Sequence, residues 1–270
     1  MNFKKTIFEG FITVIFFVGI WYALMQIDWI NVIKLDKASE KSEQELGEIL
    51  WDVFKKSEKE INNQFVVNTI DSIVTMVCEK NHIERETIKI HIVQKDEVNA
   101  FALPNGHLVV YSGLILNSDN YEEISGVLCH EIAHIKLKHV MKKLVKEIGL
   151  SVLISITTGN SGTEIIKEAA KLLSSSAFDR SMEKEADLMA VDYLIKAQIN
   201  PEPFAEFLYK LSQLHPETSD YVDWISTHPD SKERAKYIIE YAKDKHVSQK
   251  AFISKEHWDK VKSAMADQDS

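Results

Sequence analysis

Residues 130–134 read His-Glu-Ile-Ala-His and lie in a stretch whose apolar residues recur at helical spacing. Those residues are Ile124, Val127, Leu128, Ile132 and Ile135. On a helix, His130 and His134 project from one face, about one turn or about 6 Å apart. Two imidazoles in that arrangement can share one tetrahedral zinc ion, and Glu131 lies at the flank of the same face, within reach of an activated water molecule. The alternative is a buried histidine pair that is satisfied by hydrogen bonds within the core.

The composition restricts the classes of protein to which the chain can belong. Its 270 residues are 45% hydrophobic and 27% charged, which excludes disordered and fibrous proteins, and only 9 Gly and 5 Pro favour helices. The net charge of −9 leaves no basic surface for phosphates, so we expect no nucleic acid partner. Cys78 and Cys129 are too few for a disulfide scaffold and are expected to be small buried residues. Any metal must therefore be held by histidines and carboxylates.

The N-terminal residues have the pattern of a membrane anchor. Residues 10–27 contain no charged side chain and follow Lys4 and Lys5. This length suits one spanning helix, and Trp21 and Tyr22 near its C-terminal end are typical of the membrane interface. A cleaved signal peptide and a buried soluble helix are the alternatives, but no small-residue cleavage pattern follows the apolar stretch. The sequence therefore predicts a single-pass anchor within residues 1–27.

Alternating apolar residues predict a small sheet in the middle of the chain. Residues 87–93 alternate, and residues 98–103 and 107–114 flank the turn Pro104-Asn105-Gly106. These stretches predict an antiparallel sheet of about three strands.

The rest of the chain has helical patterns. Residues 40–61 are interpreted as a largely solvated amphipathic helix, and residues 65–79 as a second helix. Asn120, followed three residues later by Glu123, resembles a helix start, and a long helix is predicted from there to Glu147. The predicted fold class is α+β and mainly helical.

A catalytic zinc site needs a third protein ligand. His139 lies five residues after His134, but no Gly interrupts residues 135–138, and a continuous helix turns His139 about 180° away from His130. Residues 179–187 offer better candidates, because Glu183 and Asp187 are spaced to face the same way on a helix. One of them can bind zinc while the other accepts the outer N–H of a ligating histidine. Glu185 competes as a ligand but lies about 200° from Glu183.

Four motifs in order support a resemblance to a known family. They are Asn99-Ala100-Phe101-Ala102-Leu103-Pro104 with Gly106, then HEIAH with His139, then Arg180-x-x-Glu183-x-x-Ala186-Asp187, then Ser226-Thr227-His228-Pro229 with Arg234. With them the chain resembles, over about residues 65–245, the zinc metallopeptidase family of type I CAAX prenyl proteases, HtpX-type heat-shock proteases and the periplasmic β-barrel assembly-enhancing protease. The family usually has Ser where this chain has Asp179.

The resemblance implies a role for each motif residue in a zincin-type peptidase domain. It implies one zinc ion held by His130, His134 and Glu183, which leaves Asp187 for the outer N–H of a ligating histidine. It also implies that His228 and Arg234 approach the substrate carbonyl and stabilise the oxyanion. His228 can alternatively be a plain residue before the helix start at Pro229.

The mechanism that follows from these residue types is peptide hydrolysis. Zinc lowers the pKa of a water molecule and polarises the scissile carbonyl, and Glu131 acts as general base and then as acid. The strand edge at Asn99, Ala100 and Phe101 is the predicted binding site for an extended polypeptide substrate, and the edge near Val109 is the alternative. Residues 158–162 and 174–176 are rich in Gly and Ser and flank a short helix, so we expect residues 158–178 to form a lid over the zinc cleft.

The combined interpretation is a membrane-anchored zinc metalloendopeptidase that acts in envelope or membrane protein quality control. It divides the chain into an anchor (1–27), a juxtamembrane helical linker (28–60), a metallopeptidase domain (61–246) and a C-terminal helical tail (247–270). Because the chain has one predicted span, the single-anchor envelope branch is favoured, with the catalytic domain on the outer side. The alternatives are a zinc-bearing envelope chaperone or assembly factor with little or no proteolysis, and a purely structural anchored module.

Overall fold

The computed structural model describes residues 13, 15–19, 22, 38–213, 222–245, 247 and 251–266. The chain divides into two compact units, residues 1–41 and residues 42–270. Most of the predicted anchor lies outside the described residues. Among the helices that are described, none combines the length and the apolar character that a membrane crossing requires.

The described part of the chain contains a three-stranded sheet. Its strands are β1 (Lys89–Val93), β2 (Ala100–Ala102) and β3 (His107–Tyr111), in the order β1-β3-β2. β2 and β3 are antiparallel, as expected from the turn at Pro104–Gly106, but β1 runs parallel to β3. The predicted all-antiparallel sheet is therefore wrong for β1. The alternating pattern identifies strand faces, but it does not specify the edge of β3 that β1 joins.

The third strand is shorter than predicted, because residues Ser112–Asn117 form helix α5. The Ser112 side chain accepts a hydrogen bond from the Lys95 N–H at 2.9 Å and donates one to the Lys95 carbonyl at 2.8 Å. The backbone N–H of Gly113 also donates to that carbonyl, at 2.8 Å. These bonds turn the chain out of the sheet immediately after Tyr111.

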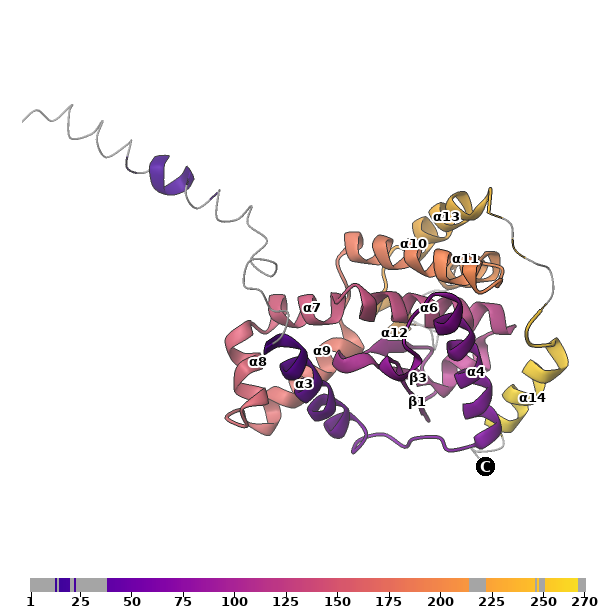
Figure 1. Cartoon of the computed structure of the whole chain (residues 1–270), viewed down its shortest axis with the longest axis horizontal. Helices are drawn as coiled ribbons and strands as arrows, with labels where there is room; N and C mark the ends of the chain where they lie inside the picture. The colour runs from indigo at the N-terminus through magenta and orange to yellow at the C-terminus, as the bar shows by residue number, and fades with distance from the viewer. Residues whose placement is uncertain are drawn as a thin grey trace, which may run out of the picture. The chain divides into compact units, whose positions relative to one another are not determined.

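Helices make up most of the remaining described chain (Figure 1). They are α3 (Ala38–Phe54), α4 (Gln64–Lys80), α6 (Tyr121–Lys136), α7 (His139–Glu147), α8 (Leu150–Thr157), α9 (Thr163–Ser175), α10 (Arg180–Lys196), α11 (Glu202–Gln213), α12 (Val222–Thr227), α13 (Ser231–Ala242) and α14 (Lys255–Ala266). Helix α6 contacts β2, α4, α10 and α11, so it lies between the sheet and the other helices. The motif helix is thus the centre of the fold.

The sheet separates two hydrophobic clusters. Alternate residues of β3 point to opposite sides, with Leu108 and Val110 in the main cluster and Val109 and Tyr111 in the second. The main cluster also contains the buried faces of α4, α6, α10, α11 and α14. The second cluster contains residues of α3, α7, α8 and α9. The prediction that this helix is largely solvated is wrong, because four apolar side chains of α3 are buried in the second cluster: Leu46, Leu50, Trp51 and Phe54.

The predicted long helix from Asn120 to Glu147 is interrupted. Helix α6 ends at Lys136, α7 begins at His139, and Lys138 between them has the left-handed angles φ 56° and ψ 27°. No Gly marks the position, so a lysine adopts a conformation that costs about 1 kcal/mol or more. The periodic apolar pattern continues across the break, and this is why the sequence predicted one helix.

Helix α6 packs closely on α11 one turn before the first motif histidine. A Cβ atom on Gly126 would collide with the side chain of Phe204, which is fully buried. We therefore expect Gly126→Ala to lower the free energy of unfolding by about 1–3 kcal/mol in urea denaturation. Gly162→Ala is the control, because open space surrounds that position, and its expected effect is below about 0.5 kcal/mol. Equal stability of the two variants would contradict the close packing.

Candidate active site

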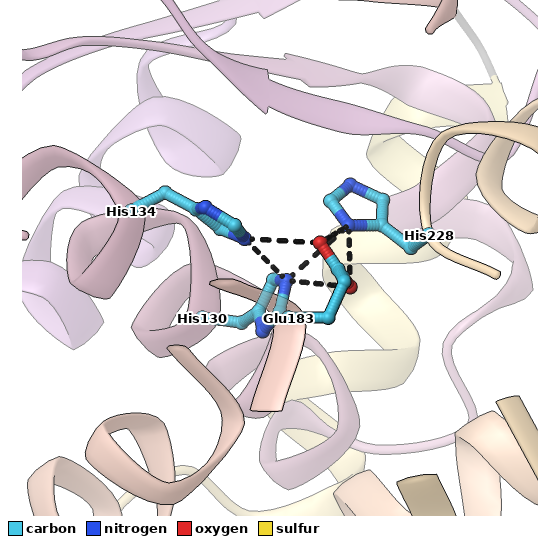
Figure 2. Close-up of side chains that lie close together, drawn as sticks. All are labelled: His130, His134, Glu183 and His228. Carbon is cyan, nitrogen blue, oxygen red and sulfur yellow. Dashed lines mark hydrogen bonds and ion pairs between the residues drawn. The ribbon is translucent and has the colours of Figure 1, made fainter. Parts of the chain in front are cut away.

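Helix α6 presents both motif histidines to one buried point. Asn120 caps the helix by accepting a hydrogen bond from the Glu123 N–H at 2.9 Å, which confirms the predicted start. His130 and His134 are fully buried, and their Nε2 atoms lie 3.0 Å apart (Figure 2). Burial lowers the pKa of His134 to about 4 and also lowers that of His130, so both rings are neutral and keep a free lone pair.

Helix α10 brings the Glu183 carboxylate to the same point. Its Oε1 lies 3.3 Å from Nε2 of His134, and its Oε2 lies 3.6 Å from Nε2 of His130. Although burial alone opposes its charge, His228, Arg234 and His130 hold the pKa of Glu183 well below its usual range. The side chain is therefore a charged acceptor that faces the two histidines.

These three groups have the chemistry and the spacing of a zinc site. Ligand atoms about 2.0–2.1 Å from a tetrahedral zinc ion lie about 3.3 Å from one another. Here the two Nε2 atoms are 3.0 Å apart, Oε1 of Glu183 is 3.3 Å from Nε2 of His134, and Oε2 is 3.6 Å from Nε2 of His130. Two neutral imidazoles and a carboxylate are a donor set that zinc prefers. The residues therefore fit the metal that the sequence predicts.

Asp187 and Arg234 support this cluster from behind. Asp187 Oδ1 lies 2.8 Å from Nδ1 of His130, and both carboxylate oxygens receive hydrogen bonds from Arg234 at 2.8 Å. A third Arg234 nitrogen lies 2.6 Å from Glu183 Oε2, and Tyr237 also donates to Asp187. Despite full burial, the charge of Arg234 and the hydrogen bonds from His130 and Arg234 lower the pKa of Asp187 to about 2. In this arrangement Arg234 orients the two carboxylates.

His228 lies among the donor atoms themselves. Its Nδ1 is 3.1 Å from each oxygen of Glu183 and 3.3 Å from Nε2 of His130 (Figure 2). The His228 ring also stacks on Trp224, with the ring centres 4.1 Å apart. The ligand atoms of His130, His134, Glu183 and His228 all lie within 4.8 Å of one another. Sequence reasoning placed His228 near the substrate but missed that it could also bind a metal.

Glu131 lies on the other side of His228. The side chain is fully buried, and its Oε1 is 3.4 Å from Nε2 of His228. Burial first, and then the charge of Glu183, raise the pKa of Glu131 well above its usual range. A raised pKa makes a carboxylate a stronger base, which favours proton transfer from a water molecule.

A second cation near the site was not anticipated from the sequence. Lys143 is one turn after His139 on α7, and only 4% of its surface is exposed. Its ammonium group contacts the Ser176 carbonyl and lies 4.1 Å from the centre of the Phe178 ring, which in turn stacks on His134 at 4.1 Å. Burial lowers the pKa of Lys143 to about 8, while the charges of Glu131 and Glu183 oppose that shift. A single lysine in a helical pattern gives no sequence signal for this position.

Of the predicted substrate residues, Ala100 and Phe101 lie on β2 and Asn99 immediately precedes it, all outside the metal cluster. Asn99, Ala100 and Phe101 are all buried, and Ala100 and Phe101 pair with β3. The Asn99 side chain donates a hydrogen bond to the Ser174 carbonyl at 3.3 Å, and α9 contacts β2. The C-terminal part of α9 therefore lies next to this part of the chain.

Comparison with known proteins identifies similar sequences. The profile of Peptidase family M48 matches residues 66–242. The chain is 25% identical over 187 residues to "Mitochondrial metalloendopeptidase OMA1" of Arabidopsis thaliana, which covers 69% of this chain and 38% of that protein. It is 30% identical over 166 residues to "Metalloprotease LoiP" of Escherichia coli (strain K12), with coverages of 58% and 64%.

A third relative is the "Beta-barrel assembly-enhancing protease" of Escherichia coli (strain K12). The chain is 24% identical to it over 200 residues, which cover 69% of this chain and 41% of the relative. The chain thus spans less than two thirds of the length of each of these three relatives.

Proposed function

The chain belongs to Peptidase family M48, and on this premise we propose that it is a zinc metalloendopeptidase that hydrolyses peptide bonds in polypeptides. The observation that supports this proposal most strongly is the convergence of His130, His134 and Glu183, with donor atoms 3.0–3.6 Å apart, next to the buried Glu131 carboxylate. Two substitutions test the proposal. Substitution of Glu131 should lower cleavage without loss of zinc, and substitution of Glu183 should weaken zinc binding itself.

We assign one residue set to each task. His130, His134 and Glu183 would hold one zinc ion, and Asp187 would fix the tautomer of His130 through its Nδ1. When bound, zinc supplies Lewis acidity for water and for the scissile carbonyl. Glu131 takes a proton from the attacking water at a carboxylate oxygen and later gives it to the leaving amine.

His228 and Arg234 complete the proposed machinery. The Nε2 of His228 lies beside Glu131, which suits the stabilisation of negative charge on the substrate carbonyl oxygen. Arg234 already contacts Glu183, Asp187 and the His228 carbonyl, so its contribution is to hold these groups in place. Its predicted contact with the substrate carbonyl stays a prediction.

The proposed biological role is protein quality control in an envelope or membrane. The relatives with the printed names of a mitochondrial metalloendopeptidase and a β-barrel assembly-enhancing protease support this role. The apolar residues 10–27 would anchor the chain once in a membrane, with the peptidase domain on the outer side.

A reporter fused after Ser270 tests this topology. Lys4 and Lys5 precede the apolar stretch and favour an N-terminus inside the cytoplasm, so we expect alkaline phosphatase to be active in this fusion. A fluorescent protein that needs reducing conditions is the opposite control and is expected to stay dark. A fluorescent fusion would reverse the proposed orientation and leave the zinc site unaffected.

We also propose that residues 158–178 form a lid on the substrate strand. The C-terminal part of α9 accepts a hydrogen bond from Asn99, just before β2, and is followed by Phe178, which stacks on His134. The inner face of α9 is buried in the second cluster through Ala169, Ala170 and Leu173. In this position α9 would cover the strand edge that an extended peptide needs.

Leu173→Ala should open the lid, because the loss of about 2 kcal/mol or more of packing at this buried position shifts a closed–open equilibrium about 30-fold or more. We expect kcat/KM for a short peptide to rise by that factor while zinc content stays unchanged. Ile165→Ala, at a 44% exposed position on the same helix, is the control and should leave kcat/KM unchanged. A Leu173→Ala protein with lower stability but unaltered kcat/KM would make α9 an ordinary structural helix.

A further inference from the structure

His139 and Glu185 form a pair on the outer side of His134. The Nδ1 atom of His139 lies 3.1 Å from Nδ1 of His134, and its Nε2 lies 3.2 Å from Oε2 of Glu185. His139 is fully buried, whereas the Glu185 side chain is 58% exposed. Sequence reasoning rejected both residues as zinc ligands, and neither is among the four side chains whose donor atoms converge.

The positions of the nitrogens define the direction of the hydrogen bonds. Nε2 of His134 faces Glu183 and His130, so this nitrogen is the one available to a metal ion. A neutral imidazole that uses Nε2 as a ligand carries its proton on Nδ1. That proton points to Nδ1 of His139, which must accept it. His139 therefore carries its own proton on Nε2 and donates it to Glu185.

The break between α6 and α7 makes this arrangement possible. In a continuous helix, His139 would lie about 180° from His130 around the axis. The left-handed Lys138 ends that helix, and α7 restarts at His139 with its ring centre 5.1 Å from that of His134. The left-handed conformation of Lys138, although unfavourable for a lysine, therefore places the His139 side chain next to His134.

We propose that His139 is a positioning residue for the zinc ligand His134, with Glu185 as the terminal acceptor of the same chain of hydrogen bonds. This inference rests on the proposed zinc site. His130 has a carboxylate directly on its outer nitrogen, that of Asp187 at 2.8 Å, whereas His134 reaches one only through the imidazole of His139. Such contacts fix the ring orientation and tautomer of a ligand and make it a better donor.

The two members of the pair should contribute unequally. His139 lies in a buried environment, where loss of its acceptor would leave the His134 N–H without a partner. The Glu185 carboxylate is mostly in solvent, which screens its charge. We therefore expect substitution of His139 to weaken zinc binding more than substitution of Glu185 does.

Two substitutions of matched shape test the role of the acceptor in the full-length chain. In His139→Asn the side-chain oxygen takes the place of Nδ1 and still accepts the His134 proton, whereas His139→Leu has similar size and no acceptor. The measured quantity is the zinc dissociation constant, by competition with a chromophoric chelator. We expect His139→Leu to weaken zinc binding about 10- to 100-fold and His139→Asn to remain close to the wild type.

Equal affinity of the wild type and His139→Leu would overturn the inference, and so would equal weakening in both variants. A wild-type chain that binds no zinc would contradict the proposed function as well, which distinguishes the two failures.

A second measurement does not depend on the folding of variants. In zinc-bound protein with 15N-labelled histidine, we expect a scalar coupling across the hydrogen bond between the two Nδ1 atoms, and its absence would also overturn the inference.

Discussion

Glu131→Gln is expected to lower peptide cleavage about 100- to 10,000-fold while the protein keeps one zinc ion per chain. The amide has the shape of the carboxylate but cannot take a proton from water. Oε1 of Glu131 lies 3.4 Å from Nε2 of His228, and the amide oxygen of glutamine can keep this contact. Metal analysis and a quenched-peptide assay on the same preparation measure the two quantities.

The matched control is Glu122→Gln on the same helix, outside the cluster, for which we expect wild-type cleavage. Loss of zinc in Glu131→Gln would show that Glu131 is a ligand or a structural residue. Full retention of cleavage would contradict the general-base assignment. If the wild type bound zinc but cleaved no peptide, the chaperone or assembly-factor alternative would be favoured.

Glu183→Gln is expected to weaken zinc binding by at least about 100-fold, because it removes the only charged ligand of the proposed set. The amide keeps an oxygen that can accept from Arg234, so the buried guanidinium retains a partner. His134→Ala should have a similar effect on zinc. The dissociation constant is the primary measurement, and the melting temperature of the metal-free protein shows whether the fold is intact.

Glu206→Gln on α11 is the control, because that side chain is exposed and should not alter zinc binding. A Glu183→Gln protein with wild-type zinc affinity would refute the choice of third ligand. The other members of the donor cluster would then have to be reconsidered, with His228 first, since its Nδ1 lies within 3.3 Å of His130 and Glu183.

Local patterns in the sequence predicted the elements that depend on local interactions. The helix around HEIAH, its cap at Asn120 and the turn at Pro104–Gly106 are all present. The helical spacing of Glu183 and Asp187 predicted that they face the same way, and in the structure both lie next to His130.

Features that depend on distant contacts could not be predicted in the same way. The direction of β1 is decided by the edge of β3 that it joins, and the strand pattern is identical for either choice. No glycine marks the break at Lys138 in the sequence. The packing of α7 on the second cluster compensates for the backbone cost of the left-handed lysine, and this packing depends on residues far away in the sequence. His228 lies 45 positions after Glu183, and only folding brings them into contact.

The division of the core by the sheet has a consequence for how the protein opens. The ligand helices α6 and α10 belong to the main cluster, whereas α8 and α9 belong to the second. Segments that share few apolar contacts can exchange their amide hydrogens independently of one another. The half that contains α8 and α9 can therefore undergo sub-global unfolding, on its own timescale, while the half that contains the two ligand helices stays intact. If α9 is the lid proposed above, thermal fluctuation of the second cluster would control access to the proposed zinc site.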